Sequence, residues 1–178
     1  MHRWLSALSR KDEKCCAWDV FLSHDWGAHE RVKLLHQALK LAGLQAWLDD
    51  SNMSGDVVHS MTSGIDDSSL FVACITRNYI DKCAKAENDN CKLELDYAYH
   101  RKGGERLVAL VLDIDCLDTS TWQGKTGAYL CSRLYLDCTT DAKMIASAIA
   151  LVDLARNRAE QQKRQRPRRY SKQRVVPL

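Results

Sequence analysis

Cys91 and Glu94 stand three residues apart in the segment NDNCKLELDYAYHRKGG, which spans residues 88–104. The segment is predicted to be helical, and a spacing of three places both side chains on one face of a helix. A carboxylate held out of water can stabilise positive charge electrostatically. Most glutamates on helices face solvent instead, so the rest of the chain must decide between these two interpretations.

A second polar group follows the first predicted strand, WDVFLS at 18–23, and consists of Ser23, His24, Asp25 and Trp26. Serine, histidine and aspartate are the residues of a hydrolase triad. Consecutive residues at a strand end point to opposite sides, however, whereas a triad needs its three groups to converge. The chain also has no G-x-S-x-G turn. A triad is therefore rejected.

Polar residues also follow the next two predicted strands. Asp49, Asp50, Ser51 and Asn52 follow one of them, and Thr76-Arg77-Asn78 follows the other. A receiver domain would need an acidic pair after the first strand, an aspartate after the third and a lysine after the fifth. The chain has Ser-His-Asp, threonine and Cys-Thr-Thr there, so it is not a receiver. It contains neither G-x-G-x-x-G nor a P-loop sequence.

Eight cysteines raise the question of disulfides or a metal site. Several lie in apolar runs such as FVACIT, where a thiol packs as a small hydrophobic group. No C-x-x-C pair is present, and the adjacent Cys15 and Cys16 are poorly placed to ligate one tetrahedral ion. We expect reduced structural thiols and no metal, with palmitoylation of Cys15 and Cys16 as an alternative.

The charge of the chain is unevenly distributed. Nine basic residues and one acidic residue lie between Arg156 and Arg174, while the whole chain has a net charge of +3. The remainder is thus acidic, and residues 156–178 form a basic tail that we expect to be disordered or to extend the last helix. Contact of this tail with nucleic acid or an anionic surface is a further possibility.

A cytoplasmic location is expected from the sequence. No apolar run approaches the roughly 18 residues that a membrane span requires. The N-terminal segment MHRWLSALSRKDEK lacks the apolar length and cleavage site of a signal peptide. His2 excludes N-myristoylation. Residues 1–16 are therefore interpreted as a short leader.

Strands and helices alternate along the chain. Strands are predicted at 18–23, 44–50, 69–76, 107–114 and 133–138, and helices at 29–43, 57–68, 77–104 (with a break) and 141–162. The central strands are apolar throughout, which indicates a parallel sheet covered by helices on both faces. The predicted fold is a flavodoxin-like, five-stranded α/β domain that binds ligands beyond the carboxyl ends of its strands. For the last helix, the predicted apolar face comprises Met144, Ile145, Ile149, Val152 and Leu154.

Five of these segments, in order, resemble a Toll/interleukin-1 receptor (TIR) domain. DVFLSH at 19–24 and AWLDD at 46–50 resemble its first two strands, and SNMSGD at 51–56 resembles its BB loop, with Gly55 as the loop glycine. SLFVACITRNYI resembles the third strand and its exit. Cys91-x-x-Glu94-Leu95 resembles the C-x-x-E-L pattern of the following helix. The similarity covers residues 17–155, taken as a single domain.

The resemblance implies one of two functions, because some TIR domains only assemble while others cleave NAD at the nicotinamide–ribose bond. Glu94 matches the glutamate that the cleaving enzymes use. IDKCAKAENDNCK at 80–92 is similar to the matching segment of the animal axon-degeneration NAD hydrolase. Asn90 stands where that enzyme has tryptophan, and Asp25-Trp26 stands where it has two arginines.

These departures imply that other residues contact the substrate. Arg77, backbone N–H groups or a neighbouring protomer would bind the phosphates, and Trp26 or Trp47 would stack on a ring. Ser23, His24, Asp25, Asp49 and Ser54 are further candidate cleft residues. The positively charged nicotinamide is a good leaving group, so one carboxylate suffices to stabilise the oxocarbenium-like sugar cation. NAD is then a substrate, and no cofactor is expected.

Two hypotheses follow from the resemblance. The first is an NAD glycohydrolase or cyclase, switched on by self-association, in immune-type or cell-death signalling. The second is a non-enzymatic interaction module that binds copies of itself or other TIR proteins. It would use the BB-loop residues Ser51, Asn52, Met53 and Gly55. Loss of turnover on replacing Glu94 would favour the first hypothesis, and loss of association on replacing Met53 or Gly55 would favour the second.

Overall fold

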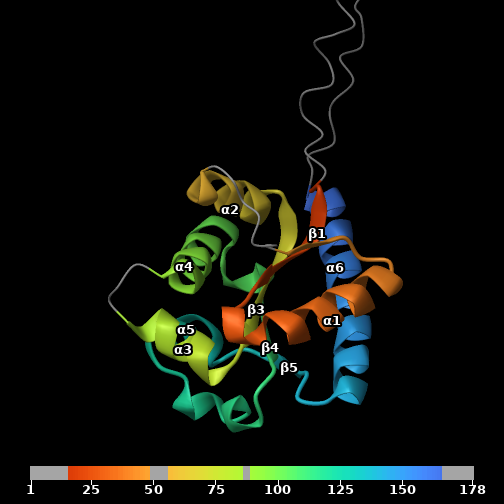
Figure 1. Ribbon diagram of the computed structural model, residues 1–178. Coiled ribbons are helices and arrows are strands. Elements are labelled where there is room, and N and C mark those ends of the chain that lie inside the picture. Colours follow the sequence, from red (N-terminus) through yellow and green to blue (C-terminus); the bar gives the residue numbers. More distant parts are fainter. Residues whose placement is uncertain (1–15, 49–55, 86–88, 166–178) are drawn as a thin grey trace, which may run out of the picture.

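The computed structural model describes residues 16–48, 56–85 and 89–165. They form one five-stranded sheet with the order β2-β1-β3-β4-β5, in which every neighbouring pair is parallel (Figure 1). The strands are β1 (Trp18–Ser23), β2 (Ala46–Leu48), β3 (Ser68–Ile75), β4 (Leu107–Val111) and β5 (Tyr135–Asp137). This order is that of flavodoxin-like folds, and it confirms the predicted fold class.

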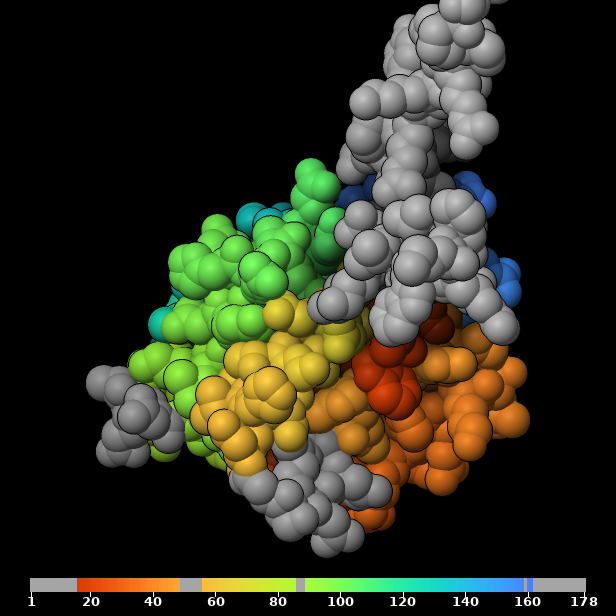
Figure 2. Space-filling model, turned by 90° about the horizontal axis from the view of Figure 1, so that it is seen from above, coloured from red at the N-terminus to blue at the C-terminus, as the bar shows by residue number. Residues whose placement is uncertain are grey.

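Helices cover both faces of the sheet (Figure 1). α1 (His29–Leu41) and α6 (Asp141–Gln165) pack together on one face. The other face carries α2 (Val57–Asp66), α3 (Arg77–Ala84), α4 (Asn90–Lys102) and α5 (Gly124–Leu130). Figure 2 shows α2 and α4 side by side at the surface, with α1 on the other side of the start of β1. The sequence patterns gave no expectation for α5.

The predicted break between α3 and α4 is confirmed, and side-chain caps explain where each helix starts. The Thr76 hydroxyl accepts a hydrogen bond from the backbone N–H of Tyr79 at 3.0 Å, which caps α3. Asp89 accepts one from the N–H of Cys91 at 2.9 Å, which caps α4. α4 ends at Gly103, whose φ of +70° suits a residue without a side chain.

Alternation along β1 divides its side chains between two hydrophobic clusters. Val20 and Leu22 pack in the cluster under α1 and α6, while Phe21 belongs to the cluster under α2 to α5. Ser23, two residues beyond Phe21, faces the same side as Phe21. The alternation of side chains along β1 therefore directs the Ser23 hydroxyl toward α4.

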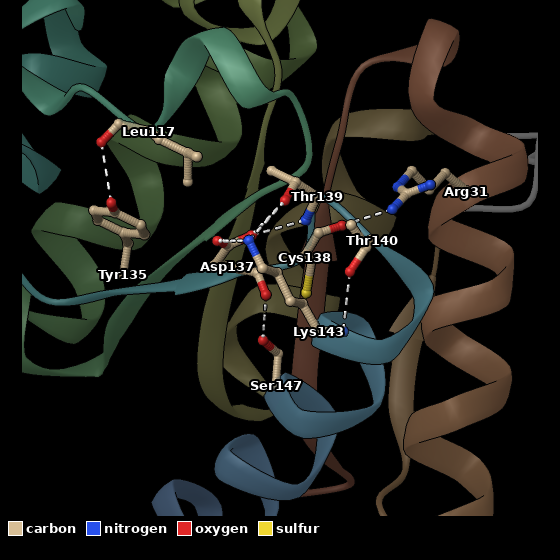
Figure 3. A network of polar contacts seen from close by, with 9 residues as sticks. All are labelled: Arg31, Leu117, Tyr135, Asp137, Cys138, Thr139, Thr140, Lys143 and Ser147. Atoms are coloured by element: carbon tan, nitrogen blue, oxygen red, sulfur yellow. Dashed lines mark hydrogen bonds and ion pairs between the residues drawn. The ribbon is translucent and has the colours of Figure 1, made fainter.

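The carboxyl end of β5 is tied to α1 and α6 by polar contacts (Figure 3). The Asp137 carboxylate accepts hydrogen bonds from the Thr139 N–H at 2.9 Å and the Lys143 ammonium at 2.7 Å. Ser147 donates to the Asp137 carbonyl at 2.9 Å, and Arg31 donates to the Cys138 carbonyl at 2.7 Å. These contacts fix the start of α6 against the sheet.

The prediction for the apolar face of α6 is partly wrong. Met144 and Val152 are buried, but Ile145 and Ile149 are 60% and 59% exposed, and Leu154 also faces solvent. The buried stripe is instead Met144, Ala148, Leu151, Val152 and Ala155. Small alanines at spacings of three and four face the sheet, which lets α6 pack closely, and the bulkier isoleucines lie about 100° away around the helix.

The described cysteines form no disulfide with one another. Cys16, Cys74, Cys83, Cys91, Cys116, Cys131 and Cys138 are all free, and five of them are buried. Cys15 lies outside the described residues. Within the described part of the chain, no helix is long and apolar enough to cross a membrane. α6 continues past position 155, where the basic tail was predicted to begin.

Candidate functional site

A cavity of about 260 Å³ lies beyond the carboxyl end of β1, beside the first turns of α4. In this strand order the chain direction across the sheet reverses between β1 and β3, and α/β folds bind ligands at such points. The cavity is lined by Leu22, His24, Trp26, Lys82, Asp89, Asn90, Cys91 and Glu94.

Glu94 is held in this cavity by a hydroxyl relay. Its side chain is only 8% exposed, and its Oε2 atom accepts a hydrogen bond from the Ser23 Oγ at 2.5 Å. The Ser23 Oγ also lies 3.0 Å from the Tyr79 Oη. Because the single proton of Ser23 goes to Glu94, the Tyr79 hydroxyl donates to Ser23. Burial raises the pKa of Tyr79 well above its usual value, so this donor keeps its proton.

The start of α4 also presents a thiol to the cavity. Cys91 is one turn before Glu94 on the same face, as the spacing predicts, and its Sγ lies 3.5 Å from the His24 carbonyl. Burial and the nearby Glu94 charge raise the pKa of the Cys91 thiol. A thiol that keeps its proton is a poor nucleophile, so Glu94 is the stronger candidate for chemistry.

An aromatic group forms another wall of the cavity. The His24 Nε2 and the His29 Nδ1 lie 2.8 Å apart, so one ring donates to the other. Trp26 packs against His29 with ring centroids 4.7 Å apart and is 53% exposed. Burial and the proximity of His29 lower the pKa of His24. His24 is therefore neutral at pH 7, and Trp26 offers an accessible ring at the rim.

Asp25 has a structural role in this arrangement. Its carboxylate is 2% exposed and accepts hydrogen bonds from the Gly27 N–H at 2.9 Å, the Asn78 amide at 2.8 Å and the Thr76 hydroxyl. It caps the short 3-10 turn at Trp26–Ala28. Asp25 lines a separate cavity on the α1 side and does not line the one that contains Glu94.

Ser23, His24 and Asp25 do not form a triad. Ser23 bonds to Tyr79 and Glu94, His24 to His29, and Asp25 to the three donors named above. Among the described contacts, no hydrogen bond joins any two of these three side chains. The side-to-side alternation at the strand end explains the separation.

Two predicted substrate contacts lie elsewhere. The Trp47 indole stacks on Phe21 with centroids 4.4 Å apart and packs over Gly64 of α2. Arg77 donates to the Asp115 carbonyl at 3.2 Å and to Thr121 at 3.4 Å, which directs its guanidinium toward the turns after β4. Neither residue lines the Glu94 cavity. Asp49, Ser51, Asn52, Met53, Ser54 and Gly55 lie outside the described residues.

Several lining residues were not identified from the sequence. Lys82 belongs to the last turn of α3, and Asp89 caps the start of α4. Tyr79 does not line the cavity, but its hydroxyl contacts Ser23 and was also not identified. Asp89 could have been found as a helix cap, since it immediately precedes the helical segment. Lys82 carried no such signal. Within the described ranges, no three His, Cys, Asp or Glu side chains are grouped to hold a metal ion.

A family model and one solved structure agree with this fold. The model of the TIR domain family matches residues 20–147. The TIR domain of the Toll-related receptor TRR-2 from Hydra magnipapillata is similar, with 14% identity and a TM-score of 0.55, over 77% of this chain and 98% of that one. The TIR domains of the activated Roq1 resistosome that recognises the effector XopQ match at 17% identity and a TM-score of 0.48, over 83% and 98% of the two chains. No curated protein matches the chain.

Proposed function

The chain belongs to the TIR domain family, and from this membership and the Glu94 cavity we propose that it cleaves NAD at the nicotinamide–ribose bond. The observation that carries the proposal is the hydrogen bond from Ser23 to Glu94 at 2.5 Å inside the cavity. On the surface, water would donate hydrogen bonds to a glutamate, and a buried hydroxyl donor would not be required. Glu94 is 8% exposed and is oriented by the Ser23 hydroxyl, so its carboxylate can stabilise positive charge that develops beside it.

The size of the cavity suits part of the substrate. Sites that enclose a drug-sized ligand measure about 300–1,000 Å³, and the cavity of about 260 Å³ is just smaller than that range. It accommodates the nicotinamide–ribose end of the dinucleotide, while the rest lies across the rim. The exposed Trp26 ring at that rim provides a surface on which a planar ring can stack.

The reaction requires no general acid. The bond between the ribose C1′ and the pyridinium nitrogen breaks, and its electron pair neutralises the nitrogen, so nicotinamide leaves uncharged. The Glu94 carboxylate stabilises the oxocarbenium-like ribose that remains. Water then adds to C1′ and loses a proton, which gives ADP-ribose. Attack on C1′ by a group of the adenosine part would give a cyclic product, so analysis of the products distinguishes these outcomes.

Self-association is part of the proposal, because the TIR resemblance implies that neighbouring protomers complete the site. Nicotinamide release should therefore increase faster than linearly with protein concentration. Strict proportionality would show that one protomer holds a complete site. This outcome would remove the association requirement and leave the role of Glu94 in place.

The test is release of nicotinamide from NAD by the purified chain and by the Glu94→Gln variant. Glutamine preserves the shape and can still accept from Ser23, but it carries no charge. We expect at least about 100-fold slower release, the effect of removing one electrostatic stabiliser in other enzymes, in a variant that remains folded. Glu105→Gln is the matched control, because Glu105 is exposed and pairs with Arg158 away from the cavity.

Two outcomes would contradict the proposal. Equal rates for the wild-type chain and Glu94→Gln would assign turnover to another group. A folded chain that releases no nicotinamide at any protein concentration would favour the non-enzymatic interaction module. In that case, replacing Met53 or Gly55 becomes the informative experiment, with self-association as the readout.

A further inference from the structure

Lys82 is the one lysine or arginine among the described residues that line the Glu94 cavity. It belongs to the last turn of α3, and its side chain is 27% exposed, so its ammonium reaches both the cavity and solvent. The cavity also contains two carboxylates, Glu94 and Asp89, and the neutral His24. The cavity thus combines two carboxylates with one ammonium group.

The ion pair of Lys82 leaves its ammonium able to bind a ligand. The Nζ atom lies 3.6 Å from the Asp89 Oδ2, whereas charge-assisted hydrogen bonds measure about 2.7–2.9 Å. Within the described part of the chain, Lys82 forms this ion pair and no shorter polar contact. Asp89 is meanwhile held by the N–H of Cys91 at the start of α4. A phosphate oxygen can thus approach Lys82 without breaking a tight bond.

Lys82 and Glu94 line the same cavity but differ in exposure. Glu94 is 8% exposed, whereas the Lys82 side chain is 27% exposed. In a nicotinamide nucleotide, a phosphate is attached to the ribose whose C1′ carries nicotinamide. A ribose beside Glu94 therefore extends its phosphate toward the rim. Arg77, the phosphate contact predicted from the sequence, bonds to Asp115 and Thr121 and is not available there.

We propose that Lys82 binds the phosphate next to the nicotinamide ribose and thereby makes the site selective for phosphorylated nicotinamide ribosides. Asp89 competes for the same ammonium and so weakens this binding. The inference rests on the proposed function for its substrate. It predicts that substrates with and without a phosphate respond differently to the same substitution.

The test compares three substrates: NAD, nicotinamide mononucleotide and nicotinamide riboside, which has no phosphate. Lys82→Gln should lower kcat/KM about 10-fold for the first two, the loss of one charge-assisted contact, and less than 2-fold for the third. Lys82→Arg should retain most of the activity. Lys85→Gln is the matched control, because Lys85 is exposed just beyond α3 and does not line the cavity.

A second variant should act in the opposite direction. Asp89→Asn removes the competing charge but keeps a side chain that caps helices equally well. We expect kcat/KM for NAD to rise about 2- to 5-fold and that for nicotinamide riboside not to rise. Equal losses for all three substrates in Lys82→Gln, or a loss for NAD in Asp89→Asn, would overturn the assignment.

Calorimetric titration with ADP-ribose separates this inference from the proposed function, because it needs no turnover. If Lys82→Gln weakens binding about 10-fold and Lys85→Gln does not, the phosphate contact is supported even in a chain that releases no nicotinamide. If wild-type and Lys82→Gln proteins bind ADP-ribose equally, or neither binds it, the contact does not exist.

Discussion

Replacing Ser23 with alanine removes the hydroxyl that orients Glu94, and we expect it to slow nicotinamide release without unfolding the chain. Ser23 is 1% exposed, and its Oγ donates to the Glu94 Oε2 at 2.5 Å. A hydrogen bond to a charged group contributes about 1.5–3 kcal/mol. Since 1.36 kcal/mol corresponds to a factor of ten in rate, kcat should fall about 10- to 160-fold.

The same substitution also affects stability. It leaves the Tyr79 Oη, which is fully buried, without the Ser23 acceptor. A buried polar group that loses its partner costs about 1–3 kcal/mol. For a chain of this length, each kcal/mol lowers the melting temperature by about 2–4 °C. The variant should therefore remain folded at 25 °C, and its kcat can be measured.

Two matched variants separate orientation from stability. Ser68→Ala removes a buried serine hydroxyl that donates to the Gly64 carbonyl at 2.7 Å, so it should lower the melting temperature but not kcat. Tyr79→Phe removes the second donor of the relay and leaves the bond between Ser23 and Glu94. We expect it to change kcat less than Ser23→Ala does.

The assay is steady-state release of nicotinamide by each variant, with circular dichroism melting on the same samples. The reasoning fails if Ser23→Ala keeps wild-type kcat while it loses stability. It also fails if Ser68→Ala slows release as strongly as Ser23→Ala, because the effect would then follow stability and not the orientation of Glu94.

Three further predictions concern stability. Asp25→Ala leaves three donors without their acceptor and should lower the free energy of unfolding in urea by about 2–4 kcal/mol; a change below 0.5 kcal/mol would contradict the capping role. Gly64→Ala places a Cβ 2.8 Å from the Trp47 ring and should cost about 1–3 kcal/mol by the same measurement, whereas a neutral result would mean that Trp47 moves freely. Hydrogen bonds from Lys143 and the Thr139 N–H lower the pKa of Asp137 from 3.8 to about 2, so this group contributes stability above pH 4 that is lost as pH falls toward 2. Lys143 is half exposed, so the contribution is at most about 1 kcal/mol, and Lys143→Met should reduce it in acid titrations followed by fluorescence.

Most of the fold could be predicted from the sequence because its signals are local. β3 is apolar over most of its length and fully buried, and the buried residues Val32, Leu35 and Leu39 of α1 recur at helical spacing. The face of α6 could not be predicted in the same way. Alanine carries little hydrophobic weight in a sequence pattern, yet at Ala148 it permits the close packing that leaves the isoleucines exposed.

The site could be predicted only where a motif marks it. Glu94 and Cys91 were identified by their spacing, and Ser23 by its place at a strand end. Arg77 and Trp47 were chosen for their chemical type, but the direction of a side chain depends on partners that are distant in sequence: Asp115 and Thr121 for the arginine, and Phe21 for the tryptophan. Lys82 was missed for the same reason.

The most direct test of the central claim is the rate of nicotinamide release from NAD by the wild-type chain and by Glu94→Gln, measured side by side at high protein concentration. Glu94 is proposed to act through its charge, so release should be readily detected for the wild-type chain and fall by at least about 100-fold in the variant. Comparable rates for the two proteins, with both folded, would contradict the claim that the carboxylate in this cavity performs the chemistry.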